Sequence, residues 1–328
     1  SKGTEISPII RFPSSSLGST PLYIARVFIA KGHILSGSDL SISDYTKKLS
    51  TLGAEIFLGH NRNNIGQAEL LVTTAAVKND NPELIAAKEK SIPIMLRAEM
   101  VQILTSEYEL IAIAGSHGKT TTTGLIALIL EKGKLDPLVL LGGNSPDLGG
   151  NLRIGSGKYA VVEADEYAKA FLQYRAKIAL ITNIEIDHLD YYKSEKNLYN
   201  AFDQFAEQVI SSGLLVISID SPLASKLKKN YESSGRAVET YSIEKNDAIW
   251  SARNLRPNEF GGLTSNIFLE GRYLGEISLP IIPLKKTVTF AAVKPNIWLK
   301  ISNQRFLFIK KINTYQPYTW PKLMQHLI

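Results

Sequence analysis

Apolar residues along the first hundred positions recur with two periods, which predict helices and strands in turn. Spacing of three to four residues predicts helices, and short apolar runs predict buried strands. The expected helices are 24–31, 45–52 and 82–88, and the expected strands are 33–36, a segment around Ile56, 70–74 and 92–95. This alternation predicts a parallel sheet flanked by helices, closing near Ser106.

A second series of the same kind follows. An apolar strand over 110–114 runs into a glycine-containing turn and then into a helix over 121–131, which stops at Gly133. Further strands are expected at 138–141, 159–163, 178–182 and 214–219, with a helix over 195–209. We therefore expect an α/β protein with one domain over 1–106, a second over 107–280 and an atypical tail over 281–328. Residues 1–20 and 281–328 show no clear period.

Composition and charge narrow the classes of function. The chain has 328 residues, of which 44% are hydrophobic and 21% charged, as in ordinary globular proteins. No apolar run approaches the roughly 20 residues of a membrane-spanning helix, so no membrane segment is expected. The net charge of +6 comes from scattered basic residues, and an anionic small substrate explains it as well as nucleic acid, which we do not expect. The absence of cysteine excludes disulfides and thiolate metal sites, and the start lacks the order of a signal peptide, so a cytoplasmic location is expected.

The turn after 110–114 has the residues that bind a nucleotide triphosphate. It reads Gly115-Ser116-His117-Gly118-Lys119-Thr120. Glycines let the backbone approach phosphates, N–H groups at a helix start point at them, a lysine supplies charge and a threonine hydroxyl can ligate Mg²⁺. Ile113 stands where the general P-loop pattern has a further glycine. The alternative is a glycine-rich turn that merely caps a structural helix.

Two further segments place polar groups where buried strands end. Glu163-Ala164-Asp165-Glu166 follows one strand, and its carboxylates suit a hard cation bound to phosphates. Thr182-Asn183-Ile184-Glu185-Ile186-Asp187-His188 follows another, and His188 beside Asp187 could take a second metal or a phosphate oxygen. By itself the first segment is more often a solvated loop, and a lone histidine is more often structural. Their conjunction with the glycine turn favours a site.

Together, these three segments resemble the successive central-domain signatures of the Mur ligase family, in the same order and with the same spacing. Gly115 to Thr122 gives the first signature, Glu163 to Glu166 the second and Thr182 to His188 the third. Ser36 to Asp39, Thr74 to Pro82 and Arg97 to Met100 resemble the N-terminal domain of the branch that adds L-alanine and of the related branch that recycles the murein tripeptide. The resemblance covers residues 22 to 279 and implies a Rossmann-like UDP-sugar-binding domain and a P-loop-type ATPase domain.

The resemblance implies an ATP-dependent, amide-forming ligase of peptidoglycan precursor synthesis, and so a part in cell-wall biogenesis, cell shape and cell division. Family members phosphorylate the carboxylate of UDP-N-acetylmuramic acid with ATP, and the amino group of an amino acid, here expected to be L-alanine, attacks the acyl phosphate. Catalysis of this kind depends on positioning and charge neutralisation.

Individual roles follow from the resemblance. Lys119 would hold the β- and γ-phosphates. Thr120 and Glu163 would hold the first Mg²⁺, and His188 would hold a second metal. The expected catalytic residues are Lys119, Glu163 and His188, and the expected ATP-binding residues are Gly115, Ser116, His117, Gly118, Lys119, Thr120, Thr121 and Asn183. Gly115 to Gly118 would contribute backbone N–H groups, while Asn183 and Asp187 would shape the third signature's loop.

Four residues are candidates for the sugar nucleotide. Asp39, expected at the end of a strand, is placed to accept hydrogen bonds from a uridine, although the same position suits a turn or helix cap. Arg97, Asn151 and Arg153 could meet the diphosphate or the muramyl group. For the arginines the alternative is an ordinary surface position.

Several positions depart from the family's pattern. Residues 15–22 hold one glycine and a proline where relatives carry a glycine-rich loop for the UDP diphosphate. No Gly-x-His-Asn-x-x-Asn adenine signature follows Pro280, we expect the family's C-terminal domain to be absent, and Ala168 stands where relatives often have an acidic residue. A nucleotide-binding remnant without ligase activity, the tripeptide-recycling ligase and an unrelated P-loop hydrolase or kinase are therefore the alternatives.

Overall fold

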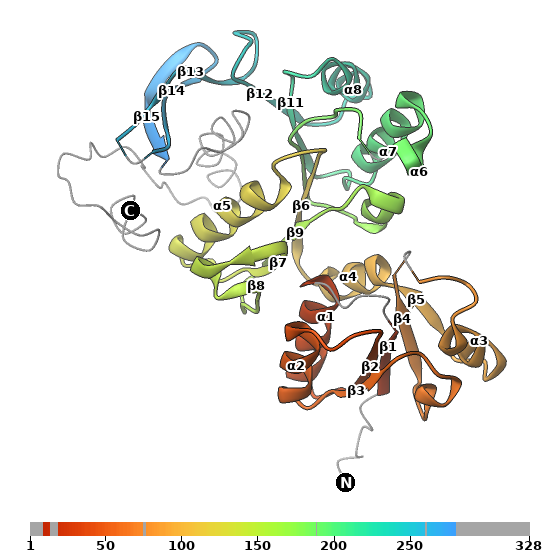
Figure 1. Ribbon diagram of the computed structural model, residues 1–328. Helices are drawn as coiled ribbons and strands as arrows, with labels where there is room; N and C mark the ends of the chain where they lie inside the picture. The colour runs from red at the N-terminus through yellow and green to blue at the C-terminus, as the bar shows by residue number, and fades with distance from the viewer. Residues whose placement is uncertain (1–8, 14–18, 75–76, 188, 260, 280–328) are drawn as a thin grey trace. The chain divides into compact units, whose positions relative to one another are not determined.

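The computed structural model describes residues 9–13, 19–74, 77–187, 189–259 and 261–279. The chain divides into two compact units, one of residues 1–106 with 142–144 and one of residues 107–141 with 145–328. Each unit is built on a largely parallel sheet with helices, so the expected α/β class is confirmed (Figure 1). No helix in these ranges combines the length and apolar character needed to cross a membrane. The expected tail, 281–328, lies outside the described residues.

The first unit is a five-stranded parallel sheet in the order β3-β2-β1-β4-β5, which is a Rossmann-like arrangement. Its strands are β1 (Ile9–Pro13), β2 (Ile34–Asp39), β3 (Glu55–Leu58), β4 (Leu70–Thr73) and β5 (Ile94–Leu96). Its helices are α1 (Ser19–Ala30), α2 (Asp44–Thr51), α3 (Pro82–Glu89) and α4 (Arg97–Thr105), with a 3₁₀ turn at Arg62–Ile65.

Strand β1 lies within residues 1–20, where the sequence shows no clear period. Ile10 pairs in parallel with Leu35 on one side and Leu70 on the other, so β1 is the central strand of the sheet. Ile10 and Phe12 are both buried. The strand was missed because five residues that include a proline give too short a pattern to establish a period.

The second unit is a ten-stranded sheet in the order β15-β14-β13-β12-β11-β10-β6-β9-β7-β8. The strands are β6 (Glu109–Ala114), β7 (Leu138–Ser145), β8 (Gly150–Arg153), β9 (Tyr159–Glu163), β10 (Ile178–Ile181), β11 (Leu214–Ser218), β12 (Val238–Ser242), β13 (Trp250–Pro257), β14 (Leu263–Leu269) and β15 (Arg272–Leu279). The helices are α5 (Lys119–Lys132), α6 (Leu189–Tyr192), α7 (Glu195–Glu207) and α8 (Pro222–Ser233), with 3₁₀ turns at Pro146–Leu148 and Tyr167–Gln173.

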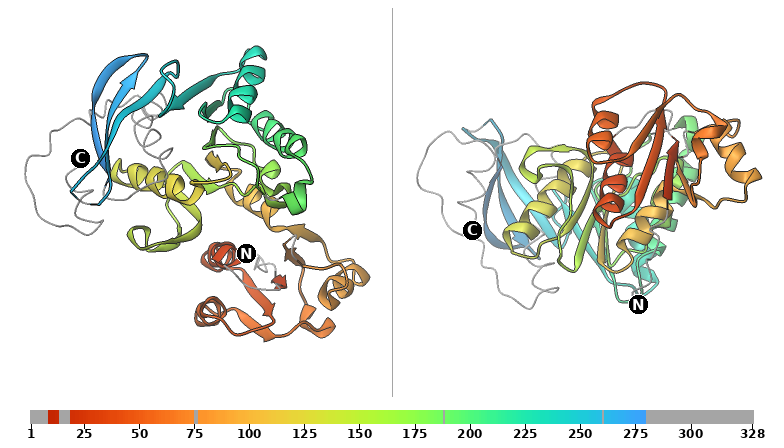
Figure 2. Two further views of the ribbon diagram at one scale, coloured as in Figure 1. Left: turned by 45° about the horizontal axis from the view of Figure 1, so that its top comes forward. Right: turned by 90° about the horizontal axis from the view of Figure 1, so that it is seen from below.

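Strands β6, β7 and β9 to β13 pair in parallel with one another, whereas β8 pairs antiparallel with β7, and β14 pairs antiparallel with β13 and β15. The further views in Figure 2 show α5 alongside this sheet and the β13–β15 ribbon extending it at one end. The sequence pattern had predicted the strands from β6 to β11 other than β8. No elements had been assigned after residue 219.

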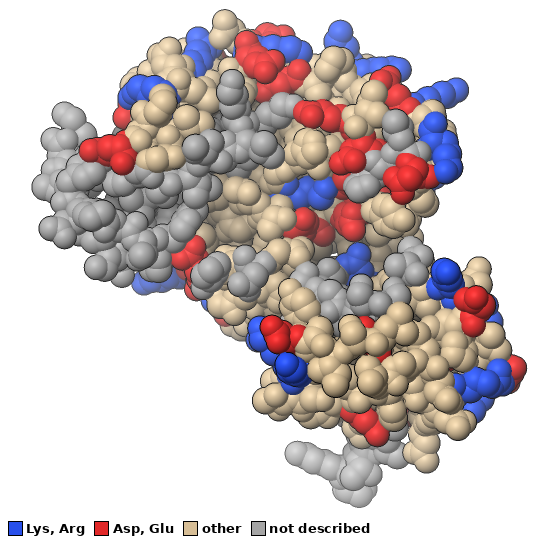
Figure 3. Space-filling view, viewed as in Figure 1, with Lys and Arg blue, Asp and Glu red and all other residues tan. Residues whose placement is uncertain are grey.

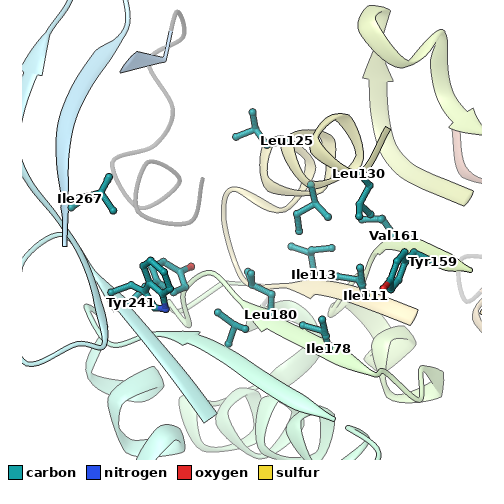
Figure 4. Packing of buried hydrophobic residues seen from close by; sticks show 14 of the residues in the cluster. Ile111, Ile113, Leu125, Leu130, Tyr159, Val161, Ile178, Leu180, Tyr241 and Ile267 are labelled. Carbon is teal, nitrogen blue, oxygen red and sulfur yellow. The ribbon is translucent and has the colours of Figure 1, made fainter. Parts of the chain in front are cut away.

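A single apolar core fixes α5 against the middle of this sheet. Leu125 and Leu130 of α5 pack with Ile111 and Ile113 of β6 and with Leu180 of β10 (Figure 4). Burial of aliphatic side chains of this size stabilises by about 1.5–3 kcal/mol each. The start of α5 is therefore held at the carboxyl end of β6.

Strand register brings three carboxyl ends together at that edge. In the sheet, β6 lies between β10 and β9, with Ala114 opposite Ile181 and Ile113 opposite Glu163. The segments that follow these strands begin at Gly115, Ala164 and Thr182. Ligands of open parallel sheets bind outside the carboxyl ends of the strands, so this edge is the place to look for a site.

Candidate nucleotide-phosphate site

The loop between β6 and α5 requires glycine at two positions. Gly115 has a φ of +137°, and a Cβ atom there would lie 2.0 Å from the Thr182 hydroxyl oxygen. Gly118, with a φ of +82°, is the left-handed residue immediately before the helix. Helix α5 begins at Lys119, two residues earlier than predicted, so Lys119, Thr120 and Thr121 form its first turn. The N–H groups of that turn have no partner inside the helix and point toward any anion bound there.

Residues 182 and 183 hold the loop in this shape. The Thr182 hydroxyl donates to the His117 carbonyl oxygen at 2.6 Å. The Asn183 side chain accepts from the His117 N–H at 3.1 Å and donates to the His117 carbonyl oxygen at 2.9 Å, while the Ser116 N–H donates to the Asn183 carbonyl oxygen at 3.2 Å. The N–H groups of Ser116 and His117, expected to bind phosphate, are therefore used by Asn183 in this structure. The first turn of α5 offers N–H groups that have no partner inside the helix.

The Lys119 ammonium is nearly buried and surrounded by acceptors. It donates to the Gly115 carbonyl oxygen at 2.7 Å and to the Oε1 atom of Glu166 at 2.9 Å, and it forms an ion pair with the same carboxylate, whose Oε2 atom lies 2.8 Å away. The side chains are 15% and 1% exposed, respectively. Burial raises the pKa of Glu166, and the charge of Lys119 opposes that rise. The sequence pattern placed Glu166 in a carboxylate run suited to a cation and gave it no role of its own.

Thr120 and Glu163 are brought together as expected. The Thr120 hydroxyl donates to a Glu163 carboxylate oxygen at 2.9 Å, across from the start of α5 to the end of β9. On the face shown in Figure 3, acidic side chains gather on the part of this unit that carries α6 and α7, while lysine and arginine are scattered. A hydroxyl and a carboxylate in contact beside a lysine form an oxygen-rich pair suited to a small divalent cation.

These residues fit a magnesium nucleotide better than a protein-only metal site. Among the described residues, no group of three or more His, Asp or Glu side chains could hold a metal ion. Mg²⁺ is usually held by one or two carboxylates together with waters and substrate phosphates, which is what Thr120 and Glu163 offer. Gly115, where a side chain would fill the loop, and the open first turn of α5 fit the phosphates.

The described part of the third signature, residues 182–187, supports the loop between β6 and α5 through hydrogen bonds. The Ser116 hydroxyl donates to the Glu185 carbonyl oxygen at 2.9 Å, and the Glu185 N–H donates back to that hydroxyl at 2.9 Å. The His117 ring lies 3.7 Å from the Glu185 carboxylate, with both side chains about half exposed. Asp187 lies on the same loop, and His188 lies outside the described residues.

Of the sugar-nucleotide candidates, Asp39 and Arg97 lie on the first unit's sheet edge. Asp39 ends β2 and is buried, its carboxylate accepting from the Ser41 N–H at 3.2 Å and its carbonyl oxygen from the Gly59 N–H at 2.7 Å. Arg97 opens α4, directly after β5. Asn151 is a buried residue of β8 in the other unit.

Arg153 is not brought to the phosphate loop. Its guanidinium donates to the Asp136 carboxylate at 2.6 Å and to the Pro137 carbonyl oxygen at 2.9 Å, before the amino end of β7. Hydrogen bonds from Ser156 and Arg153 hold the pKa of Asp136 well below its usual range. In a parallel sheet this is the edge opposite to the loop, so the structure gives Arg153 a role in fixing the β7–β8 hairpin.

Ser38, the residue before Asp39, belongs to a polar cluster with His60, Asn64 and Glu83 that the sequence pattern does not predict. The Ser38 hydroxyl and the buried Glu83 carboxylate lie 2.9 and 3.4 Å from the same ring nitrogen of His60, Nδ1. Asn64 donates to Glu83 at 3.0 Å. A nucleophilic triad needs its serine and its acid on different histidine nitrogens. The cluster therefore joins the ends of β2 and β3 to the start of α3 and does not form a hydrolase site.

Comparison with known families settles what kind of protein carries this loop. A model of the Mur ligase middle domain matches residues 113–284, and a model of the Mur ligase family catalytic domain matches residues 18–109. The chain belongs to the Mur ligase family. The matched ranges contain all three signatures and the Asp39 segment, so the resemblance deduced from the sequence is confirmed.

Curated relatives narrow the family further. The chain is 42% identical over 260 residues to the UDP-N-acetylmuramate--L-alanine ligase of Alkaliphilus metalliredigens, covering 79% of this chain and 55% of that protein. It is 41% identical over 259 residues to the ligase of the same name from Aquifex aeolicus, covering 79% and 56%. The chain thus spans about half the length of the curated relatives it matches.

Solved structures share the fold. UDP-N-acetylmuramate-alanine ligase from Thermotoga maritima superposes with a TM-score of 0.77 at 25% identity, covering 89% of this chain and 66% of that one. A UDP-N-acetylmuramate:L-alanyl-gamma-D-glutamyl-meso-diaminopimelate ligase from Neisseria gives a TM-score of 0.77 at 21% identity, covering 88% and 92%. The Rossmann-like and P-loop-type architectures predicted for this Mur ligase are therefore confirmed.

Proposed function

We propose that this Mur ligase joins L-alanine to the lactyl carboxylate of UDP-N-acetylmuramic acid with ATP as the second substrate and Mg²⁺ as the cofactor. The observation that carries the proposal is the arrangement of Lys119, Thr120 and Glu163 around the Gly115–Gly118 turn at the carboxyl edge of the sheet. The identity of about 40% to L-alanine-adding relatives supports the choice of amino acid. The tripeptide-recycling alternative is not favoured, because its structural match shares only the fold.

The chain's own residues have defined duties in this reaction. Lys119 neutralises charge on the phosphoryl group as the substrate carboxylate attacks it and the bond to ADP breaks. Thr120 and Glu163 would hold Mg²⁺, which would neutralise charge on the phosphates, and the family resemblance gives His188 the role of holding a second metal. The amine of L-alanine then attacks the acyl carbon, loses a proton and displaces phosphate. Asn183 and Thr182 keep the loop in position throughout.

The sugar nucleotide would lie against the first unit's carboxyl edge. Asp39 is proposed to accept from the ribose or base, and Arg97 to meet the diphosphate or the muramyl group. Arg153 is left out of this set, because its guanidinium is occupied by Asp136 and Pro137. ATP and nucleotide sugars are cytoplasmic metabolites, so the proposal implies that the protein acts in the cytoplasm.

The test is ADP formation that needs both UDP-N-acetylmuramic acid and L-alanine, with the amide product identified by mass. Lys119→Met should abolish it. Lys158→Met is the matched control, because Lys158 is exposed and pairs with Glu109 at the opposite edge of the same strands. ADP formation that does not depend on the sugar nucleotide would favour a hydrolase, and product formed with the murein tripeptide but not with L-alanine would reassign the substrate.

A further inference from the structure

The Lys119 ammonium is held by two groups of its own chain. It donates to the Gly115 carbonyl oxygen and to Oε1 of the buried Glu166 carboxylate, and the Oε2 atom of that carboxylate lies 2.8 Å from it. A lysine in a phosphate loop has to reach the phosphates of the nucleotide. In this structure it is held by a carboxylate of its own chain instead.

The backbone around Glu166 is arranged to place that carboxylate. The Ala164 N–H donates to the Ile113 carbonyl oxygen at 2.8 Å, which keeps the segment on the sheet beyond the end of β9. The Tyr192 hydroxyl donates to the Glu166 carbonyl oxygen. Ala168 and Lys169 follow with φ of +52° and +59°, a left-handed pair that non-glycine residues adopt at a cost of roughly 1–3 kcal/mol each. Strain of this kind persists where the surroundings enforce it.

Stability alone does not account for the pair. Burial raises the pKa of Glu166 despite the neighbouring lysine, so the ionised carboxylate is disfavoured by its surroundings. Buried ion pairs are in general weak contributors to stability, and replacing both partners by uncharged residues is often neutral or better. A buried pair in the centre of a phosphate loop is therefore better explained by what it does for the lysine.

The two glutamates of the second signature have separate partners. Glu163 accepts from Thr120, where a cation would bind, and Glu166 accepts from Lys119. Two residues separate them in the sequence, and the turn after β9 directs one glutamate to Thr120 and the other to Lys119. Sequence alone does not distinguish the roles of Glu163 and Glu166, because both are carboxylates in one short run.

We propose that Glu166 is a positioning residue of the phosphate loop: it is the counter-ion that holds Lys119 beside Gly115 when no nucleotide is bound, and the polyphosphate of the nucleotide replaces it. The inference rests on the proposed function for the identity of the incoming anion. Exchange of one carboxylate for a phosphate keeps the ammonium paired at every stage. The cost is repulsion between the displaced carboxylate and the phosphate, which opposes binding of the nucleotide.

Calorimetric titration with MgADP tests the proposed role of Glu166 with two substitutions that should have different effects on affinity. Glu166→Gln removes the repulsion but leaves an amide oxygen for Lys119, so MgADP should bind about fivefold more tightly. Glu166→Ala also removes the acceptor, so Lys119 must be ordered by the nucleotide itself and the gain should be lost. Equal weakening by both substitutions would assign Glu166 a purely structural role and overturn the inference.

Asp165→Asn is the matched control. It removes the same charge one residue away, at a carboxylate that accepts from the Tyr167 N–H at 3.0 Å. Its affinity for MgADP should stay within about twofold of the wild type, because surface charge changes act weakly at this range. If Asp165→Asn raised the affinity for MgADP as much as Glu166→Gln does, the effect would come from net charge alone, and the inference would be overturned.

A double-mutant cycle of Lys119→Met, Glu166→Gln and the double variant, followed by thermal unfolding, measures the interaction between Lys119 and Glu166 without any nucleotide. Lys119→Met should destabilise the wild type more than it destabilises Glu166→Gln, because only in the wild type does it leave a buried charge unpaired. Equal effects in the two backgrounds would contradict the inference. Failure of the wild type to bind MgADP would instead contradict the proposed function. The unfolding cycle would then be the remaining test of the pairing between Lys119 and Glu166.

Discussion

Gly115 has a backbone conformation and a neighbour that leave no room for a side chain. Its φ of +137° lies in the region that favours glycine, and the Thr182 hydroxyl oxygen occupies the place of a Cβ atom. The same hydroxyl donates to the His117 carbonyl oxygen. A side chain at Gly115 would therefore disturb both the turn and the contact that supports it.

Gly115→Ala should lower the free energy of unfolding by more than about 1 kcal/mol and weaken nucleotide binding, because the native conformation is incompatible with alanine. Denaturant unfolding and MgADP titration measure the two effects. Gly124→Ala is the control: Gly124 lies within α5 with no atom near its absent Cβ, so the substitution should stabilise by about 0.5–1 kcal/mol. Similar behaviour of the two variants would contradict the role given to Gly115.

The sequence identified those residues whose chemical role can be predicted from residue type and from spacing within a motif. Lys119, Thr120 and Glu163 come together as their positions after strands predicted. Glu166 and Arg153 did not follow from type, because their roles depend on which partner the fold brings within reach. Charged side chains of this kind need the three-dimensional contacts before a role can be assigned.

The loop after β10 acts as a support for the loop after β6. Asn183 bonds to both the N–H and the carbonyl oxygen of His117, and Glu185 exchanges two hydrogen bonds with Ser116. These hydrogen bonds hold the phosphate loop against the loop after β10.

Asn183→Ala should raise the hydrogen-exchange rate of the His117 amide by about tenfold, since each lost hydrogen bond contributes about 0.5–1.5 kcal/mol. The amide's exchange is followed by NMR. Asn230→Ala is the matched control, because Asn230 donates to the Tyr199 hydroxyl between α7 and α8 at 2.9 Å and touches no part of the loop. Unchanged protection of the His117 amide in Asn183→Ala would show that the loop holds its own shape.

Elements with a clear period were predicted, and those without one were not. The strand, glycine turn and helix of residues 109–132 were recognised because a buried strand and a stop at Gly133 bound the pattern on both sides. Strand β1 was missed because its five residues include Pro13, and β13–β15 because their alternation is broken by charged and polar residues on an edge of the sheet. Tertiary pairing decides such segments.

As a whole, the molecule carries the sequence signatures of the Mur ligase family on two α/β units. The order β3-β2-β1-β4-β5 and the position of β6 between β9 and β10 each create an edge at which strand ends converge. Fold class was predictable from alternation of strands and helices alone. A ligand can be proposed for either edge only from the residues that follow the strands.

The central claim is that Lys119 and the pair of Thr120 and Glu163 form the site for a magnesium nucleotide. Its most direct test is calorimetric titration of the wild type and of Lys119→Met with a non-hydrolysable ATP analogue in the presence of Mg²⁺. The account predicts saturable binding of one equivalent by the wild type and a loss of about 10- to 100-fold in affinity for the variant, the value of hydrogen bonds to a charged group. Equal affinity of the two proteins would contradict the claim.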